Sequence, residues 1–266
     1  MKKVKPLKKF SQNYLIDKNI IKKIVDQLEL KKEDCLVEIG PGIGSITEIL
    51  VDKCDNLILI EIDTRVIEHL TSQFQQIKII NDDFLKVDLS KVSSEFCNKK
   101  KLRFTGNIPF NITSPILFKL FEYKTIIKDA VFIMPFDIAK KLNAKPKTKE
   151  YGILTVLTNY FLEPKILFKI SPNVFRPQPK ILSAAVHLKS KSRADKLLDE
   201  KLFITVVKSA FGNRRKTLKN SLSNSIFEVY NYSGIKLDIT KRAEEFELKD
   251  FIYLTKYFQE QINAKQ

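Results

Sequence analysis

The sequence of 266 residues predicts an α/β protein with an open, doubly wound parallel sheet and a small helical domain after it. Three observations lead to this prediction. Short apolar runs alternate with segments of helical periodicity over the first two thirds of the chain. A glycine-rich turn, Gly40-Pro41-Gly42-Ile43-Gly44, follows the first buried run. After Leu188 the chain becomes polar, basic and helical in character.

The expected elements follow one another in a regular order. Apolar residues at helical spacing predict a helix over 15–30, and Cys35-Leu36-Val37-Glu38-Ile39 predicts the first buried strand. A second helix is expected from Ser45, which can cap it, with Glu48 three residues later. A third helix is expected over 64–74. The other strands are expected at 57–60, 77–80, 101–105, 130–134, 166–170 and 181–187, with the last two paired at one edge of the sheet.

A boundary between two domains is expected near residue 190. The segment from Lys189 to Arg193 is polar and resembles a linker. The prediction is an α/β domain over 1–190 and a helical domain over 191–266.

The charge of the chain indicates a polyanionic partner. Lys and Arg number 47 against 31 Asp and Glu, which gives a net charge of +16. The positive charge is clustered: five of the first ten residues are lysines, and 201–221 holds six basic residues and no acid. The residues expected to bind nucleic-acid phosphates are Lys8, Lys9, Arg214, Arg215, Lys216 and Lys219.

The cysteines and histidines argue against a metal site. Three cysteines, at 35, 54 and 97, and two histidines lack the spacing of a ligand set, so we expect no metal and no disulfide framework. A reducing, cytoplasmic setting fits this composition.

The sequence shows no signal for export or for a membrane. The lysine-rich start is not followed by the apolar segment of a signal peptide, and no uncharged apolar stretch reaches the roughly 18 residues of a membrane span. No exposed apolar repeat argues for a dimer, so a monomer is expected.

Polar residues that follow predicted strands outline a cofactor site. Gly40, Gly42 and Gly44 allow a ligand to approach the backbone at a helix start. Glu61 lies 21 residues after Gly40, at the end of the next strand, where its carboxylate can bind both hydroxyls of a ribose. Asp83, favoured over Asp82, can accept from an adenine amino group, with Leu85 as a wall for the ring. The pattern Gly-x-Gly-x-Gly favours S-adenosylmethionine over NAD. An NAD-dependent oxidoreductase is the less favoured alternative, because the sequence offers no obvious proton-relay residue and such an activity does not explain the basic clusters.

The segment Asn107-Ile108-Pro109-Phe110 indicates the target. The Asn107 side-chain oxygen and the Pro109 carbonyl can accept both hydrogens of an exocyclic amine, and Phe110 offers a face on which a base can stack. These acceptors stabilise positive charge that develops on the amine during methyl transfer. The expected reaction is therefore methylation of adenine N6 in RNA. In this prediction 1–190 is the S-adenosylmethionine-binding catalytic domain and 191–266 is the helical RNA-recognition domain. Because a paired base cannot reach such a pocket, the target is expected to be single-stranded or flipped out.

Six blocks of the chain, in order, carry a resemblance to a known family. They begin at Phe10, Glu38, Glu61, Asp83, Gly106 and Phe175, and a further match runs from Phe211 to Leu218. In these blocks the chain resembles the rRNA adenine N6,N6-dimethyltransferase family, of the KsgA type, over nearly its whole length. The resemblance implies a Rossmann-like, class I S-adenosylmethionine-dependent methyltransferase sheet. It also implies that Asn13 and Leu15 line the methionine side of the cofactor, with Gln12 close by. The predicted cofactor-binding residues are thus Gln12, Asn13, Leu15, Gly40, Gly42, Glu61, Asp83 and Asn107, and the predicted catalytic residues are Asn107, Pro109 and Phe110.

The resemblance also implies a substrate, with alternatives. The family dimethylates two adjacent adenines in a loop near the 3′ end of small-subunit (16S) rRNA during ribosome assembly. Ser11, Ile108 and Phe110 depart from the family pattern. The segments Ser11-Gln12-Asn13 and Asn107-Ile108-Pro109 resemble relatives that methylate a large-subunit (23S) rRNA adenine and confer macrolide resistance. The block from Arg214 to Leu218 and the strand with Pro179, Lys180, Ser183 and Ala184 resemble the small-subunit enzymes, and the C-terminal evidence is given more weight. A ribosome-assembly factor with secondary catalysis is the other alternative.

Overall fold

The computed structural model describes residues 12–191 and 198–264, which form two compact units. The first unit comprises the described residues up to Ala139 together with Leu162–Ser190. The second comprises Lys140–Phe161 and the described residues from Lys191 onward. The predicted first domain, 1–190, thus includes Lys140–Phe161, a segment that groups with the C-terminal residues.

Aromatic packing explains this grouping. The Tyr160 ring lies 4.1 Å from that of Phe203, and the Tyr151 hydroxyl donates to the Phe246 carbonyl at 2.8 Å. These partners are distant in sequence, so the apolar helix that contains Tyr160 could not be assigned to the second unit from local pattern.

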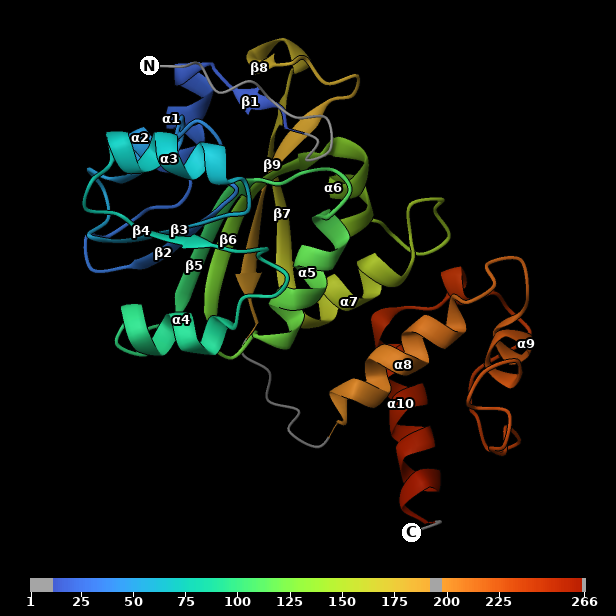
Figure 1. The fold of residues 1–266 in the computed structure, drawn as a ribbon. Coiled ribbons are helices and arrows are strands. Elements are labelled where there is room, and N and C mark those ends of the chain that lie inside the picture. Colours follow the sequence, from blue (N-terminus) through green and yellow to red (C-terminus); the bar gives the residue numbers. More distant parts are fainter. Residues whose placement is uncertain (1–11, 192–197, 265–266) are drawn as a thin grey trace. The chain divides into compact units, whose positions relative to one another are not determined.

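The first unit is built on a seven-stranded sheet with the order β4-β3-β2-β5-β6-β9-β7 (Figure 1). Strands β2 to β6 are parallel to one another, and β9 is antiparallel to both β6 and β7. This confirms the predicted doubly wound α/β class and the pairing of the last two strands. The strands of the sheet are β2 (Cys35–Ile39), β3 (Asn56–Glu61), β4 (Lys78–Asn81), β5 (Leu102–Asn107), β6 (Ile127–Pro135), β7 (Leu162–Ile170) and β9 (Ser183–Ser190).

Helices cover both faces of this sheet (Figure 1). On one face lie α1 (Lys18–Asp26), α2 (Thr47–Leu50) and α3 (Thr64–Gln73), and on the other α4 (Leu89–Phe96) and α5 (Thr113–Glu122). The buried cluster on the first face joins Ile24, Leu50 and Leu70 of the helices to Leu36 and Leu59 of the strands. Helical and strand periodicities thus place apolar side chains against each other at this interface.

Two helix starts differ from the sequence-based expectation. The first helix begins at Lys18, because the Asp17 carboxylate caps it by accepting from the Ile20 N–H at 3.0 Å. The residues before it form β1 (Tyr14–Leu15), which pairs with β8 (Phe175–Arg176) in a separate two-stranded sheet. Ser45 does not cap α2, since that helix starts only at Thr47 and has no side-chain cap bond. The turn built on the three glycines continues to residue 46 and delays the helix.

The second unit is helical, as expected. Phenylalanines with 0% exposure lie at its core: Phe203, Phe227, Phe251 and Phe258. Its helices are α7 (Ile153–Phe161), α8 (Glu200–Ala210), α9 (Leu218–Ser223) and α10 (Leu248–Asn263), while α6 (Phe136–Leu142) spans the boundary between the units. Short 3-10 helices lie at Pro172–Val174 and Ala243–Glu245.

The expectation of unpaired cysteines needs correction. Cys35 at the start of β2 and Cys97 after α4 form a disulfide, with Cα atoms 5.7 Å apart, and Cys54 is free and buried. The two partners are 62 residues apart in sequence, so only the fold brings them together.

None of the helices in the described parts of the chain has the length and apolar character that a membrane crossing requires.

Candidate active site

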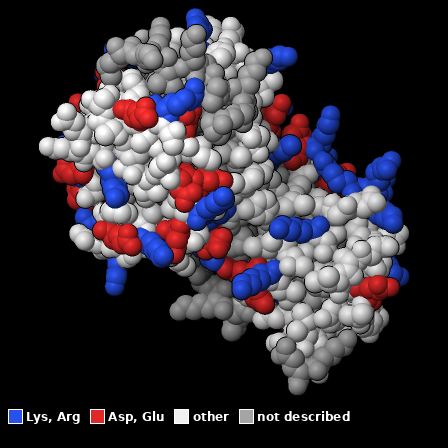
Figure 2. Space-filling view, in the orientation of Figure 1, with Lys and Arg blue, Asp and Glu red and all other residues white. Residues whose placement is uncertain are grey.

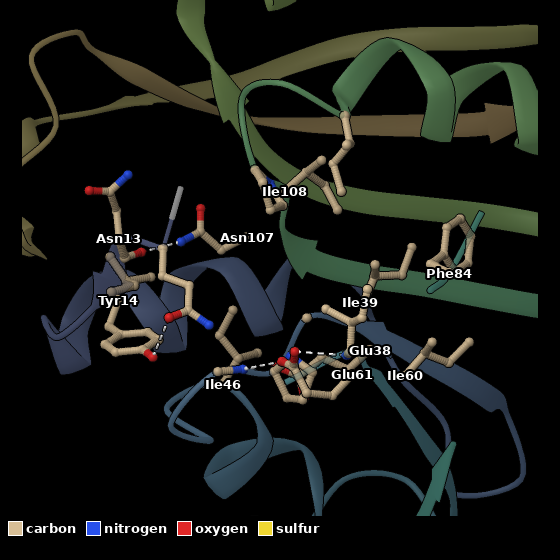
Figure 3. Close-up of a pocket in the computed structure, with 18 of the residues that line it drawn as sticks. Asn13, Tyr14, Glu38, Ile39, Ile46, Ile60, Glu61, Phe84, Asn107 and Ile108 are labelled. Atoms are coloured by element: carbon tan, nitrogen blue, oxygen red, sulfur yellow. Dashed lines mark hydrogen bonds between the residues drawn. The ribbon is translucent and has the colours of Figure 1, made fainter. Parts of the chain in front are cut away.

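A pocket opens at the carboxyl ends of the parallel strands, where open α/β sheets bind ligands (Figure 3). Of the described residues that the sequence assigned to the cofactor or to catalysis, Gly44 and Leu85 do not line this pocket, and Gly44 packs against Leu70 and Phe74 instead. All the others line it. These residues are Gln12, Asn13, Leu15, Gly40, Gly42, Glu61, Asp83, Asn107, Pro109 and Phe110.

Gly40 and Gly42, the two glycines of the turn that line the pocket, have different surroundings. Both have left-handed backbone, with φ of +62° at Gly40 and +56° at Gly42. A Cβ added at Gly40 meets nothing within 4 Å, whereas one added at Gly42 lies 2.9 Å from the Tyr14 ring. Gly40 therefore leaves open space on the pocket side for a ligand, and Gly42 lets an aromatic ring pack on the turn.

Within the described residues, the Glu61 carboxylate is held by hydrogen bonds from backbone N–H groups. It accepts from the N–H groups of Ile62 and Asp63, both at 2.9 Å, and from Gly42 at 3.4 Å. Only 5% of the residue is exposed. Burial raises the pKa of Glu61, and the three N–H donors act against this rise. An acceptor-only group at the end of a strand can bind a pair of ribose hydroxyls.

Glu38 is a second buried carboxylate in the pocket, and sequence reasoning did not assign it a role. It is 1% exposed and accepts from the Thr47 hydroxyl at 2.7 Å. Burial raises the pKa of Glu38 to about 7; the Thr47 hydrogen bond lowers it and the nearby Glu61 charge adds to the rise. The signal in the sequence is a single acid within an otherwise apolar strand, where an ionisable residue has a cost without a partner.

The walls near Asp83 differ in part from the prediction. Both Asp82 and Asp83 line the pocket, and Asp83 is the more buried of the two. Asp83 accepts from the Leu85 N–H at 2.9 Å, so it already makes a local turn. The prediction of Leu85 as a wall is wrong: Phe84 lines the pocket instead, and its ring packs edge-on against Phe104 at 6.0 Å. After β4 ends at Asn81 the chain turns, so that Asp82, Asp83 and Phe84 line the pocket and Leu85 does not.

Asn107 ends β5 and is oriented by the N-terminal segment (Figure 3). Its Nδ2 donates to the Asn13 carbonyl at 2.6 Å. Because a carbonyl can only accept, the amide nitrogen must face Asn13, and the side-chain oxygen is left as an acceptor. The contact links positions 94 residues apart.

The Pro109 carbonyl already accepts hydrogen bonds within the chain. It accepts from the Thr113 hydroxyl at 3.1 Å and from the Ile112 N–H at 3.2 Å. A target amine can use this oxygen only if the Thr113 hydroxyl turns to another acceptor. Asn107 is therefore the more available of the two predicted acceptors, and Phe110 lines the pocket beside them.

The N-terminal segment closes one side of the pocket. Gln12 Nε2 donates to Asp63 at 3.3 Å, and the Tyr14 hydroxyl donates to Gln12 Oε1 at 3.1 Å. Burial, together with Asp63 and Glu61, raises the pKa of Tyr14 to about 12, so its hydroxyl remains a donor. The roles of Tyr14 and Asp63 were not predicted. Lys8 and Lys9 lie outside the described residues.

The remaining predicted RNA contacts belong to the second unit. Arg214, Arg215, Lys216 and Lys219 are all exposed, in the turn after α8 and the start of α9. Arg214 also bonds to its own chain, to the carbonyls of Lys149 and Tyr151 and to Glu244. No cluster of three or more His, Cys, Asp or Glu side chains that could hold a metal ion occurs within the part of the chain that is described.

Comparison with known proteins identifies the same family as the sequence motifs do. Residues 4–260 match the family model described as "Ribosomal RNA adenine dimethylase". A "Ribosomal RNA small subunit methyltransferase A" from Francisella tularensis is 39% identical over 96% of this chain and 98% of its own length. The protein of the same description from Chlorobium phaeobacteroides is 40% identical over 93% of this chain and 89% of its own length.

Two crystal structures share the fold. A dimethyladenosine transferase from Plasmodium falciparum has a TM-score of 0.76 at 22% identity, covering 92% of this chain and 97% of its own. The 23S rRNA methyltransferase ErmE has a TM-score of 0.66 at 24% identity, covering 92% and 100%. With the family model matched over nearly the whole length, and relatives of about this length well above 30% identical, the chain belongs to the ribosomal RNA adenine dimethylase family.

Proposed function

We propose that the chain transfers methyl groups from S-adenosylmethionine to N6 of two adjacent adenines near the 3′ end of small-subunit rRNA, during ribosome assembly. The observation that carries the proposal is the orientation of Asn107. Its side-chain nitrogen is fixed on the Asn13 carbonyl, and its oxygen is left as an acceptor in the pocket that also holds Glu61. One pocket thus combines a nucleoside-binding carboxylate with an acceptor for an exocyclic amine.

The residues present fit the methyl donor. Glu61 would bind the ribose hydroxyls, the open backbone at Gly40 would meet the methionine part, and Asp83 would accept from the adenine amino group. Ile62, a large apolar side chain that is 47% exposed beside Glu61, offers a surface for the adenine ring. When bound, S-adenosylmethionine supplies an electrophilic methyl group on a sulfonium.

Asn107 then acts on the target amine. The N6 lone pair is delocalised into the adenine ring, so the amine is a weak nucleophile. Asn107 Oδ1 accepts one N6–H, favours the pyramidal amine and stabilises the positive charge that develops on N6. The carbon–nitrogen bond forms as the carbon–sulfur bond breaks, and N6 afterwards loses its extra proton to solvent. Phe110 provides the stacking face that holds the base in line.

The small subunit is the proposed substrate because of the relatives. Two that are about 40% identical over nearly their whole length are described as small-subunit methyltransferases. ErmE, which represents the large-subunit alternative, shares the fold at 24% identity. We further propose that the chain acts as a monomer in the cytoplasm and divides into catalytic and RNA-recognition domains.

The test is transfer of labelled methyl from S-adenosylmethionine to small and large ribosomal subunits isolated without prior methylation. Dimethyladenosine in small-subunit rRNA is the expected product. Asn107→Ala should lower the rate by about 10²- to 10³-fold, as for loss of one stabilising polar group in a transition state. Asn19→Ala, which removes an exposed amide from α1, serves as the matched control and should keep the rate.

Each other outcome has a definite meaning. Label on the large subunit would identify the resistance-type activity. No label on either subunit, with binding to the small subunit retained by Asn107→Ala, would identify an assembly factor. A rate unchanged by Asn107→Ala would contradict the role given to that amide.

A further inference from the structure

Arg214 is bound to its own chain although it lies in the basic turn of the second unit. Its Nη2 donates to the Lys149 carbonyl at 3.0 Å and to the Tyr151 carbonyl at 3.0 Å, and it pairs with Glu244 at 3.1 Å. Arginine has a planar donor group suited to several acceptors at once. These contacts indicate that Arg214 holds a segment in place.

The segment held by Arg214 is the loop 145–151. Two further contacts fix it: the Lys147 N–H donates to the Glu244 carbonyl at 2.8 Å, and the Tyr151 hydroxyl donates to the Phe246 carbonyl at 2.8 Å. The Tyr151 ring also lies 6.1 Å from that of Phe211, which directly precedes the basic turn. The loop and the turn therefore lie side by side, within one compact unit.

The loop adds exposed positive charge to that of the turn. Lys145, Lys147 and Lys149 are exposed, as are Arg215 and Lys216. None of these five side chains takes part in the ion pairs found among the described residues. Figure 2 shows Lys and Arg gathered at this part of the second unit. Unpaired charges in a cluster repel one another, and an anionic partner relieves that repulsion.

We propose that Lys145, Lys147 and Lys149 form, with Arg215 and Lys216, one surface that binds RNA phosphates, and that Arg214 positions the loop for this contact. The inference rests on the proposed action on rRNA and deepens it, because it extends the RNA surface to a segment in the middle of the sequence. Arg214 changes from an RNA contact to a positioning residue.

The chemistry of the surface favours RNA over a membrane. A membrane-binding surface combines basic residues with exposed apolar side chains that enter the bilayer. In the described part of the second unit, the large apolar residues that are exposed are Ile226 and Val229, which lie outside both basic segments. Lysine and arginine alone match a phosphate backbone.

The first arm of the test measures binding to small-subunit rRNA as a function of salt. We compare the full chain with a variant carrying Lys145→Gln, Lys147→Gln and Lys149→Gln. Because each phosphate contact adds about 0.7–0.9 to the slope of log K against log salt, the slope should fall by about 2. The matched control carries Lys91→Gln, Lys99→Gln and Lys101→Gln, three exposed lysines of the first unit. Lys99, like Lys147, has positive φ, so the control repeats the backbone conformation as well as the charge change.

The second arm separates positioning from contact. Arg214→Lys keeps the charge, but its shorter side chain does not bring the ammonium to the position of Arg214 Nη2, the atom that makes all three contacts. RNA affinity should therefore fall several-fold, and amide exchange over 145–151 should rise. Arg215→Lys keeps a phosphate contact and should bind within about twofold of the parent. Combining Arg214→Lys with the three loop substitutions should cause little loss beyond the loop substitutions alone.

The outcomes distinguish this inference from the proposed function. Methyl transfer is measured for every variant in parallel. If the parent methylates rRNA but the loop variant keeps its affinity and slope, the loop surface is disproved while the proposed function stands. If Arg214→Lys behaves like Arg215→Lys, the positioning role is disproved. If the loop variant instead loses binding to phosphatidylglycerol vesicles and keeps RNA binding, the partner is a membrane and the proposal fails. Absence of methyl transfer by the parent removes the proposed function itself.

Discussion

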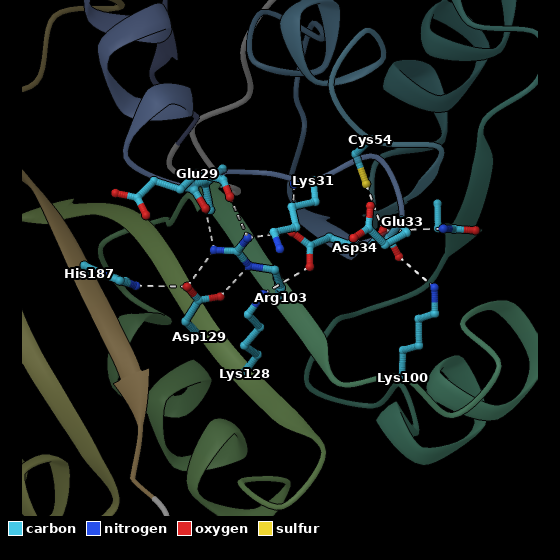
Figure 4. A network of polar contacts seen from close by, with 12 residues as sticks. Glu29, Lys31, Glu33, Asp34, Cys54, Lys100, Arg103, Lys128, Asp129 and His187 are labelled. Atoms are coloured by element: carbon cyan, nitrogen blue, oxygen red, sulfur yellow. Dashed lines mark hydrogen bonds and ion pairs between the residues drawn. The ribbon is translucent and has the colours of Figure 1, made fainter.

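Two clusters of polar side chains lie at opposite ends of the same sheet, and they are satisfied in different ways. At the carboxyl ends, Glu38 and Glu61 are buried in the pocket and receive hydrogen bonds from neutral N–H and O–H groups. At the amino ends, Asp34 and Asp129 are paired with a buried arginine, Arg103 (Figure 4).

The cluster at the amino ends is complete in itself. Arg103 forms a two-bond pair with Asp129, both at 2.7 Å, and a bond to Asp34 at 2.8 Å. It also donates to the carbonyls of Leu28 and Glu29, and the His187 ring lies 3.0 Å from Asp129. Burial alone would raise the pKa of Asp34, but hydrogen bonds from the Lys31 N–H, Arg103 and Lys128 lower it to about 2.

The difference shows where a ligand is expected. Burial raises the pKa of Glu38 and Glu61, and no cation of the described chain forms an ion pair with either carboxylate. Burial also acts on Asp129, yet hydrogen bonds from His187 and Arg103 lower its pKa. The charges at the amino ends of the strands are paired, whereas Glu38 and Glu61 at the carboxyl ends have no cation. Buried carboxylates with raised pKa values in a pocket are typical of a functional site, so the ligand is expected at the carboxyl ends.

The largest predicted effect is on the amino-end cluster. Arg103→Ala leaves two buried carboxylates without their cation, so the free energy of unfolding should fall by about 3–5 kcal/mol in urea titrations at neutral pH. Lys32→Ala is the control: its ion pair with Asp55 spans 3.4 Å between side chains that are 60% and 66% exposed. That loss should be below about 1 kcal/mol. Equal losses in the two variants would contradict the account of the buried network.

A smaller effect is predicted for Glu38, with a sign that depends on pH. The pKa is about 7 in the folded chain, above the ordinary value of 4.5. Between these values the folded state holds a proton that the unfolded state has lost, so this group makes stability fall as pH rises. Glu38→Gln removes the dependence: it should match the parent near pH 5 and exceed it by up to about 3 kcal/mol near pH 8. Urea unfolding at both pH values checks this, and a difference independent of pH would refute it.

The smallest predicted effect compares two glycines of the pocket turn. Gly42→Ala must place a Cβ against the Tyr14 ring and also adopt positive φ, so the free energy of unfolding should fall by about 1–2 kcal/mol. Gly40→Ala shares the backbone cost but meets no neighbour, so it should lose less stability. Because its Cβ would enter the pocket, Gly40→Ala should weaken binding of S-adenosylmethionine even though it changes the free energy of unfolding less than Gly42→Ala does. Thermal unfolding with and without the cofactor measures both effects.

Strand ends account for most of what the sequence could predict. Gly40, Glu61 and Asn107 follow apolar runs, and parallel strands bring their carboxyl ends to one edge, so local pattern was sufficient to group them. Asn13 is different: it reaches the pocket through a two-stranded pairing of β1 with β8 and was placed only by resemblance to the family.

The amino-end cluster could not be predicted, for a physical reason. Arg103 touches residues 26, 69 and 75 positions away, and no local periodicity encodes such contacts. The pairing of Cys35 with Cys97 and the grouping of Lys140–Phe161 with the second unit were missed for the same reason. Leu85 shows the limit at short range, because the turn after β4, which the local pattern does not specify, brings Phe84 rather than Leu85 to the pocket.

The most direct test of the central claim is the affinity for S-adenosylmethionine, measured by calorimetry for Glu61→Gln and Asp34→Asn beside the parent. Each substitution removes one carboxylate charge, at opposite ends of the sheet. Hydrogen bonds to a charged group contribute about 1.5–3 kcal/mol, so Glu61→Gln should bind about 10- to 100-fold more weakly. Asp34→Asn should bind as the parent does. Unchanged affinity in Glu61→Gln, or equal weakening in Asp34→Asn, would contradict the assignment of the pocket as the cofactor site.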